Sequence, residues 1–289
     1  MKIPRCTRPE IHDRPWCCRA VHDGVTDFLA FFAEFSGLRR KAYGRIAQFL
    51  ENGGGNKVVE LCAGSGFGAM HMLRRLRLLL PGRDVSVVAT DIKENSNWPL
   101  IRSLTEGGVS AYKKDAETAL REEDGLFVMF AALHHFSPAE IVSLLKTAME
   151  CGRAFICVDY FTRGRLVDLF PLFSGPVLMF FAAPLIFPFS WVRLILTWVF
   201  PVLPVVLFVD TLLSMLRSYT PDELKEIVAS AGLQCGKDAE VFGFVEAGGA
   251  IRMPAIILGT EVAGCNSRFD QKESDRVKSI INADEISAA

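Results

Sequence analysis

The segment Lys57–Leu80, KVVELCAGSGFGAMHMLRRLRLLL, carries the clearest information about the fold. It begins with a short β-branched run, continues through a glycine-rich turn, and ends in a stretch where Met70, Leu73 and Leu76 recur at helical spacing. This order predicts a strand, a loop and a helix. In α/β proteins such a turn lies at the carboxyl end of a strand, where glycines let the backbone approach a nucleotide-like ligand. The segment therefore predicts a ligand site in an α/β fold.

Short apolar runs alternate with helical stretches along the rest of the chain. Two of the helices have strong start signals, because Ser137 and Thr220 are each followed by a proline and then by a glutamate three residues after the cap. Strands that alternate with helices predict a mainly parallel sheet covered on both faces. The further strands expected are 84–92, 108–112, 125–133, 153–161, 240–247 and 254–262.

The composition is that of a folded protein and argues against nucleic acid as the main partner. The 289 residues are 50% hydrophobic and 22% charged, and a formal net charge of -1 gives no basic field for a phosphate backbone. The first residues lack the apolar core of a signal peptide, so we expect a cytoplasmic, reducing location. No metal site is expected near His12 and His22, because the adjacent Cys17 and Cys18 do not fit the paired spacing of structural zinc.

Two carboxylates frame the glycine-rich turn. Glu60 ends the first strand, where it would repel a pyrophosphate but attract a ligand amino group. Asp91, at the tip of the second strand, can accept hydrogen bonds from ribose hydroxyls. Gly64-x-Gly66-x-x-Ala69 also satisfies the loose dinucleotide fingerprint, so an NAD(P)-dependent oxidoreductase stays open. Glu60 and the lack of a clear Tyr-x-x-x-Lys pair disfavour that alternative.

Four motifs in order resemble those of the class I S-adenosylmethionine (SAM)-dependent methyltransferases, over about residues 57–160 and 218–260. VVELCAGSGFG resembles the first motif, with Cys62 in place of its first glycine, and VVATDI resembles the second. YKKDAET and FVMFAALHHFSP resemble two later motifs. The resemblance implies a doubly wound, mainly parallel, seven-stranded Rossmann-like sheet with SAM as the cofactor. The cofactor-binding residues that it implies are Glu60, Cys62, Ala63, Gly64, Gly66, Asp91, Ile92, Asp115, Ala116, Ala131 and Leu133.

Two adjacent histidines, His134 and His135, are the candidate catalytic residues. Methyl transfer from a sulfonium needs mainly alignment of the acceptor, and an oxygen or nitrogen acceptor also needs a base, a role that suits a neutral histidine. Because neighbouring side chains at a strand end point apart, at most one of the two is expected to face the ligand. Further candidates for the substrate side are His12, Trp16, Asp159 and Tyr160.

An apolar block, roughly residues 166–216, follows the expected strand 153–161. Its segment Pro176–Val192, PVLMFFAAPLIFPFSWV, carries no charge. Prolines are expected to break helices in the block, which favours a lid at a membrane interface over two clean crossings. A wholly buried accessory subdomain and a transmembrane hairpin stay open. The prolines concerned are Pro171, Pro176, Pro184, Pro188, Pro201 and Pro204.

The function expected is methyl transfer from SAM to a small hydrophobic or lipid-like acceptor, with peripheral membrane contact through 166–216. Trp191, Arg193 and Trp198 are expected at the headgroup boundary. A catalytically silent, membrane-associated SAM-binding protein is a further alternative, and the oligomeric state is not indicated. The domains expected are an N-terminal helical cap, 1–52, a SAM-binding domain, 53–160 and 218–262, the hydrophobic insertion, 161–217, and a mobile tail, 263–289.

Overall fold

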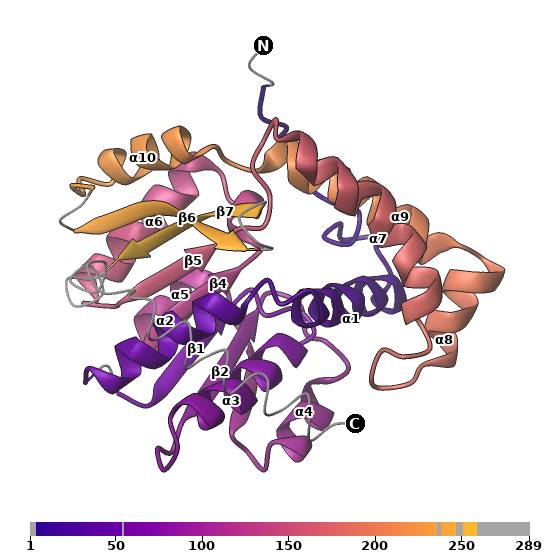
Figure 1. The fold of residues 1–289 in the computed structure, drawn as a ribbon, viewed down its shortest axis with the longest axis horizontal. Coiled ribbons are helices and arrows are strands. Elements are labelled where there is room, and N and C mark those ends of the chain that lie inside the picture. The colour runs from indigo at the N-terminus through magenta and orange to yellow at the C-terminus, as the bar shows by residue number, and fades with distance from the viewer. Residues whose placement is uncertain (1–3, 54, 236–237, 247–250, 259–289) are drawn as a thin grey trace.

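The computed structural model describes residues 4–53, 55–235, 238–246 and 251–258. Its centre is a seven-stranded sheet in the order β3-β2-β1-β4-β5-β7-β6 (Figure 1). The first five of these strands are parallel, and β7 is antiparallel to both β5 and β6. The predicted tail, 263–289, lies outside the described residues. The strands are β1 (Lys57–Leu61), β2 (Ser86–Asp91), β3 (Val109–Lys113), β4 (Leu126–Phe130), β5 (Phe155–Val158), β6 (Ala239–Glu246) and β7 (Ile251–Leu258).

Alternate residues of β1, β2, β4, β5 and β7 enter two different hydrophobic cores. Val58 faces the core shared with α2, α3 and α4, whereas Val59 faces the core shared with α5, α6 and α10. The strand geometry requires this, because successive side chains point to opposite faces of a sheet. A mainly parallel, seven-stranded sheet covered on both faces confirms the predicted fold. The covering helices are α2 (Arg40–Glu51), α3 (Phe67–Leu79), α4 (Trp98–Leu104), α5 (Ala116–Glu122), α6 (Pro138–Glu150) and α10 (Pro221–Ser230).

Both predicted capping boxes are present. The Ser137 hydroxyl accepts from the Glu140 backbone N–H, and the Glu140 carboxylate accepts from the Ser137 N–H. Thr220 and Glu223 make the same reciprocal pair at α10. These contacts involve only neighbouring residues, which is why the sequence predicted both helix starts correctly.

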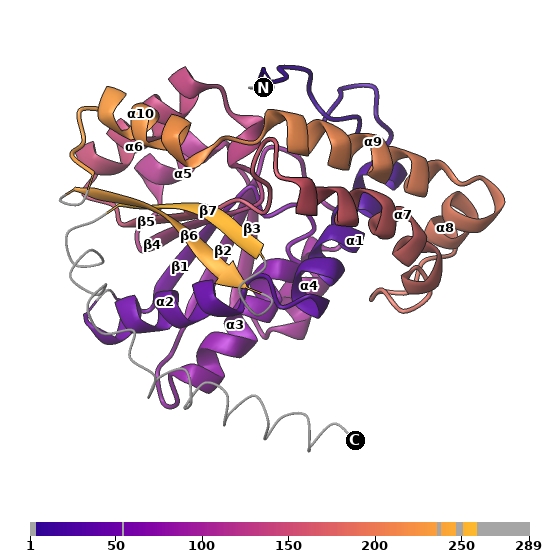
Figure 2. The ribbon, with the colours of Figure 1, turned by 45° about the horizontal axis from the view of Figure 1, so that its top comes forward.

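The chain between β5 and α10 forms a helical layer beside the sheet, next to α1 (Figures 1 and 2). A third hydrophobic core joins this layer to α1, with Phe28 of α1, Met179 of α7 and Leu203 of α9 among its members. The layer is thus packed on the N-terminal helix rather than on a face of the sheet. Its elements are η2 (Leu166–Asp168), α7 (Leu169–Ala182), α8 (Trp191–Leu194), the π-helical turn η3 (Ile195–Val199) and α9 (Val202–Arg217), and α1 spans Arg19–Phe35.

Prolines interrupt the apolar block only in part. Pro171 and Pro204 lie in the first turns of α7 and α9, where the missing N–H has no intrahelical partner. Pro176 lies inside α7, and the helix continues past it. The expectation that these three prolines break helices is therefore wrong. Pro184 and Pro188 do lie in the connection between α7 and α8.

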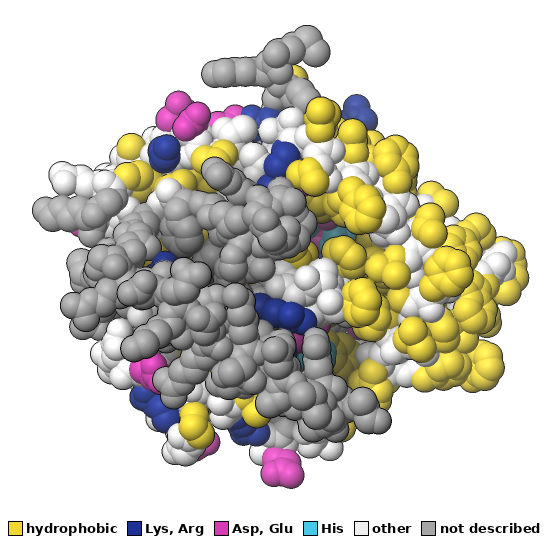
Figure 3. Space-filling view, viewed as in Figure 1, with side chains coloured by type: hydrophobic (Ala, Val, Ile, Leu, Met, Phe, Trp, Pro, Cys, Tyr) yellow, Lys and Arg dark blue, Asp and Glu magenta, His cyan; other side chains and the backbone are white. Residues whose placement is uncertain are grey.

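The outer surface of the block is apolar. Its three charged residues, Asp168, Arg193 and Asp210, are all buried, and hydrophobic side chains gather over the layer in Figure 3. Arg193 pairs with Asp27 of α1, so its predicted place at a headgroup boundary is wrong. No single helix in the described ranges is long and apolar enough to cross a membrane. The segments Trp191–Val199 and Val202–Arg217 reach that length and hydropathy only when they are taken as a pair, and the pair is bent by 80°.

Candidate active site

The carboxyl ends of the parallel strands gather the predicted residues at one edge of the sheet. β1 and β4 are neighbours, and each is followed by a residue in the left-handed region, Cys62 at φ 55° and Ala131 at φ 52°. Such a conformation costs a residue with a side chain about 1–3 kcal/mol and is concentrated at functional sites. Two adjacent strand ends thus hold strained turns at the edge where α/β proteins bind ligands.

The glycine-rich turn is tied to the end of β2. Gly64 and Gly66 have φ of 54° and 79°, and Gly66 is the N-cap of α3. The Asp91 carboxylate accepts from the backbone N–H of Gly64 at 2.8 Å and from that of Lys93 at 2.9 Å. A Cβ on Gly66 would lie 3.0 Å from Ile101 Cδ1, a tight contact, and with φ at 79° a larger residue there would also be strained. Asp91 therefore fixes the position of the turn as well as facing the edge of the sheet.

Glu60 is almost fully buried at the end of β1. Its Oε1 accepts from Arg39 Nη1 at 2.8 Å, whereas its Oε2 is buried and has no hydrogen-bond partner among the described residues. Burial raises the pKa of Glu60, although the neighbouring Arg39 acts in the opposite direction. An unpaired buried acceptor is costly, so this oxygen fits a ligand that brings a donor, such as an ammonium group.

Arg39 is a site residue that the sequence analysis missed. It precedes α2, bonds to Glu60 and also donates from Nε to the Tyr160 hydroxyl at 2.9 Å. Its guanidinium carbon lies 4.6 Å from the centre of the Phe130 ring. A Cβ on Gly68 would lie 2.1 Å from Arg39 Nη1, so the glycine leaves space for the guanidinium. No local pattern around Arg39 indicates a contact with residues this distant in sequence.

The other predicted cofactor residues have mixed environments. Asp115 is exposed and caps α5, because its carboxylate accepts from the backbone N–H and the hydroxyl of Thr118. Ile92 is 61% exposed just beyond β2. The remaining three are buried at or near the strand ends: Ala63, Ala116 and Leu133.

His134 and His135 lie in a 3-10 turn, η1 (Leu133–His135), after β4. The two rings are 4.4 Å apart between centroids, and both face the N-terminal segment. The alternation on which the expectation for the ligand rested does not apply to this turn, because β4 ends at Phe130. Asp159, after β5, accepts from the His134 backbone N–H at 3.1 Å and lies 2.9 Å from its Nδ1.

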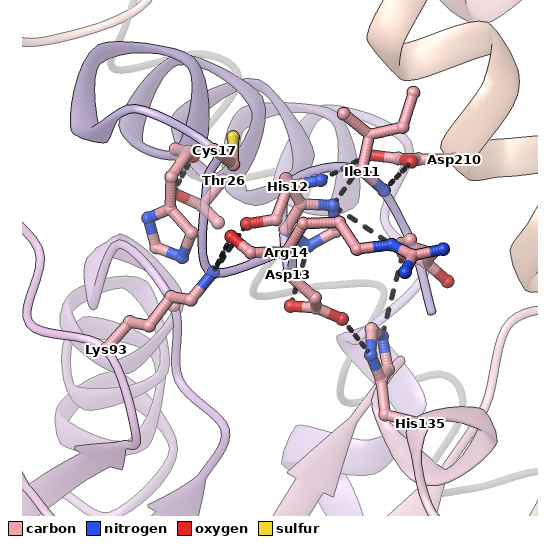
Figure 4. A network of polar contacts seen from close by, with 12 residues as sticks. Ile11, His12, Asp13, Arg14, Cys17, Thr26, Lys93, His135 and Asp210 are labelled. Atoms are coloured by element: carbon pink, nitrogen blue, oxygen red, sulfur yellow. Dashed lines mark hydrogen bonds and ion pairs between the residues drawn. The ribbon is translucent and has the colours of Figure 1, made fainter. Parts of the chain in front are cut away.

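The N-terminal segment brings more polar groups to these histidines (Figure 4). Asp13 Oδ2 lies 2.6 Å from His135 Nδ1. His12 Nδ1 lies 2.8 Å from Asp210 of α9, and Lys93 Nζ donates to the His12 carbonyl at 2.7 Å. His12 therefore lies beside the candidate catalytic residues, and its ring centroid is 6.2 Å from that of His135.

Neighbouring charges shift the pKa values in the cluster formed by Glu10, His12, His134, His135 and Asp159. Burial acts to lower the pKa of His134, but Asp159 and Glu10 outweigh it and raise the pKa to about 10. Burial acts to raise the pKa of Glu10, but the three nearby histidines lower it to about 2. A histidine that keeps its proton at neutral pH cannot accept another, so these contacts do not favour His134 as the predicted neutral base.

The three remaining candidates for the substrate side lie in different surroundings. Asp159 belongs to the histidine cluster and Tyr160 to the Arg39 side, whereas Trp16 is 71% exposed. A cavity of about 370 Å³ lies elsewhere, between α1, α3 and residues 185–187. Its lining includes Phe67 and Arg74 but none of the predicted site residues.

Comparisons with known proteins find likeness in structure alone. No protein-family profile matches the chain, and no curated protein matches it by sequence. Similar solved structures include human N-acetylserotonin methyltransferase in complex with SAM, at 15% identity and a TM-score of 0.45, over 79% of this chain and 55% of that one. An O-methyltransferase from neocarzinostatin biosynthesis, in complex with SAM and 2-hydroxy-5-methyl naphthoic acid, has 14% identity and a TM-score of 0.46 over 81% and 56%.

Mitomycin 7-O-methyltransferase is also similar, at 14% identity and a TM-score of 0.43, over 79% of this chain and 56% of that one. The chain thus spans about half the length of the solved structures it matches. The fold itself rests on the strand order and on the two cores described above.

Proposed function

We propose that this chain binds SAM and transfers its methyl group to a small hydrophobic or lipid-like acceptor. The observation that carries the proposal is the pair of carboxylates on either side of the glycine-rich turn. Glu60 Oε2 is buried without a partner, and Asp91 is held at the next strand end by the Gly64 N–H. An aminoacyl-nucleoside ligand supplies the ammonium and ribose hydroxyls that complement two such groups.

The residues present fit SAM at three points. The free oxygen of Glu60 would accept from the ammonium group, and Asp91 would accept from the ribose hydroxyls. The protein backbone of the turn at Gly64 would lie against the ligand. Asp115, at the start of α5, is proposed near the adenine amino group. The cofactor supplies an activated methyl group, and the chain supplies alignment between that group and the acceptor.

An NAD(P)-dependent oxidoreductase fits this structure less well. A dinucleotide would place its pyrophosphate at the end of β1, where the carboxylate of Glu60 would repel it. The doubly wound dinucleotide fold has the order 3-2-1-4-5-6, whereas here β7 lies between β5 and β6 and is antiparallel to both. The strand order and Glu60 thus favour SAM.

The acceptor side is formed by the histidine cluster and the insertion. Asp210 of α9 holds His12, and His12 stands beside His135, so the insertion is connected directly to the cluster. The uncharged outer surface of 166–216 supports an apolar acceptor taken from a membrane surface. We place the protein at the cytoplasmic face, where its seven described cysteines, all of them free, stay reduced.

Calorimetry with S-adenosylhomocysteine tests cofactor binding. We expect binding by the unmodified chain, and Asp91→Ala should weaken it by about 10- to 100-fold, because hydrogen bonds to charged groups contribute about 1.5–3 kcal/mol. Asp124→Ala, which removes an 82% exposed carboxylate away from the turn, is the control. Spectroscopic titration with NADH is the competing measurement, and binding of NADH in place of S-adenosylhomocysteine would refute the proposal.

Turnover is tested separately with a labelled methyl donor and a membrane lipid extract. We expect label to enter the organic phase, and the labelled product then defines the acceptor. If S-adenosylhomocysteine binds but no donor is consumed with any extract, the chain is a silent SAM-binding protein and the catalytic half of the proposal is wrong.

A further inference from the structure

We infer that Glu10, His134 and His135 form a binding site for a divalent first-row transition metal. Their ligand atoms all lie within 4.8 Å of one another. Glu10 Oε1 is 3.2 Å from His134 Nε2, and Glu10 Oε2 is 3.8 Å from His135 Nε2. Tetrahedral zinc with bonds of about 2.0–2.1 Å separates its ligands by about 3.3 Å, so the ligand atoms would have to approach one another by up to about 1.5 Å to close the site.

The Nε2 atom of His134 is the second, independent observation. His134 is 3% exposed, and this nitrogen is buried without a hydrogen-bond partner among the described residues. It lies 3.2 Å from Glu10 Oε1, which is an ion-pair distance when the ring is protonated, but the pair does not have the geometry of a hydrogen bond. A buried nitrogen left in this way is costly unless something else satisfies it, and a cation that displaces the ring proton from Nε2 into solvent would do so.

Each of the three ligands is oriented by a partner behind it. The Nδ1 atom of His134 lies 2.9 Å from Asp159, and that of His135 lies 2.6 Å from Asp13. The carboxylate of Glu10 accepts from the Ser214 hydroxyl at 2.7 Å. Metal-binding histidines commonly donate their other ring N–H to a carboxylate, and ligating carboxylates are themselves hydrogen-bonded.

The ligand chemistry selects the class of metal. Two imidazoles with one carboxylate suit zinc, iron, nickel or copper, and they do not suit magnesium or calcium, which prefer oxygen ligands. Three protein ligands leave a further position for water or another oxygen ligand. The side chain of His135 is 25% exposed, which gives an ion a route of entry.

A metal here would change the part that the histidines play. An imidazole nitrogen bound to metal has no lone pair for a proton, so His135 would be a ligand and not a base. The ion would instead lower the pKa of a hydroxyl bound at the open position. That last consequence rests on the proposed methyl transfer, whereas metal binding does not, since it is measured without donor or acceptor.

Zinc titration of the full chain after removal of metals with a chelator tests the site. We expect one zinc ion per chain by calorimetry, and Co²⁺ should give the visible absorption of a low-symmetry nitrogen and oxygen site. Glu10→Gln and His135→Gln should each weaken zinc binding by more than about tenfold, since even partners behind the ligands contribute about 10- to 100-fold. His71→Gln changes a histidine on α3 outside the cluster and is the matched control.

If Glu10→Gln does not fold, Asp13→Asn provides the test, because it leaves all three ligands in place and should still weaken binding by about 10- to 100-fold. The absence of zinc binding would overturn the inference. So would equal binding by the unmodified chain and the Glu10 variant. Absorption bands of a cobalt–thiolate bond would assign the ion to cysteines and would overturn it too.

Discussion

At the scale of single residues, Asp27 shows how burial decides the state of a carboxyl group. It lies in α1, where its oxygens accept from Asn97 Nδ2 at 2.8 Å and from Arg193 Nη1 at 3.1 Å. Burial raises the pKa of Asp27 to about 7, although Arg193 and Asn97 act in the opposite direction. The contact with Arg193 connects α1 to the insertion. Because the pKa of Asp27 is raised only in the folded chain, its titration is linked to folding.

The sign of this linkage gives a pH prediction. The folded pKa of about 7 is higher than the value of 3.8 for an unperturbed aspartate. The folded chain therefore binds more protons in this window, and Asp27 contributes stability at low pH that is lost as the pH rises through 7. In Asp27→Asn the free energy of unfolding should lose this dependence, a change in slope of up to about 1.4 kcal/mol per pH unit.

Urea unfolding between pH 4 and pH 8 measures this slope, and the other ionisable groups cancel in the comparison of the two proteins. Asp124→Asn, at an exposed position, should leave the slope unchanged. An unchanged slope in Asp27→Asn would mean that Asp27 titrates in the folded chain as it does in the unfolded one.

At the scale of elements, the first turn of α3 and the residue before α2 depend on each other. Gly68 lies in that turn, and the guanidinium of Arg39 occupies the space where a side chain would be. Arg39 in turn donates from Nη1 to the Glu60 carboxylate at 2.8 Å. The third glycine of the motif therefore has a packing role here, besides any contact with a ligand.

Gly68→Ala should accordingly destabilise the chain. The added methyl group would displace Arg39 and leave Glu60 buried without its partner, and overpacking alone costs about 1–3 kcal/mol. Chemical unfolding measures the loss, and S-adenosylhomocysteine affinity should fall with it. Gly44→Ala, on α2 with open space around it, is the matched control and should be neutral or stabilising by up to about 1 kcal/mol. Equal stability of the two variants would contradict the packing role.

At the scale of the whole molecule, the insertion has an interior and an exterior of opposite character. The three charged residues of 166–216 are buried, where Arg193 meets Asp27, Asp210 meets His12 and Asp168 meets Arg165. Its exterior is built of exposed aromatic and aliphatic side chains. The most exposed are Leu166, Phe170, Phe181, Leu185, Trp191, Val199 and Phe200. A patch of this kind on a folded chain marks an interaction surface.

Vesicle binding tests the proposed membrane contact. We expect the chain to sediment with phosphatidylcholine vesicles, and to do so equally at high salt, because the surface of 166–216 exposes no charged side chain. Phe181→Asp combined with Leu185→Asp should weaken binding more than about tenfold, since burying one such side chain contributes about 1.5–3 kcal/mol. Met149→Asp, on α6, controls for loss of an exposed apolar residue.

A chain that stays in the supernatant, or a double variant that binds as well as the unmodified chain, would refute the contact. Carbonate extraction separates the remaining arrangements, because a peripheral lid is released without detergent whereas a spanning hairpin is not.

The sequence by itself determined the elements whose signals are local. The strand, turn and helix at 57–80, the acid at the end of β2 and both capping boxes depend on residues within a few positions of one another. Periodicity and turn chemistry act over that range, so they are readable without the fold.

Only the tertiary structure decided how the site is assembled. Three ion pairs join residues that are far apart in sequence, and each forms through packing of separate elements. They are Glu10 with His134, Arg39 with Glu60, and Asp27 with Arg193. No local pattern encodes such a meeting, because it depends on which helix covers which strand end. Packing also decided what single residues contact. Arg193 is buried and pairs with Asp27, and His134 and His135 both face the carboxylate of Glu10.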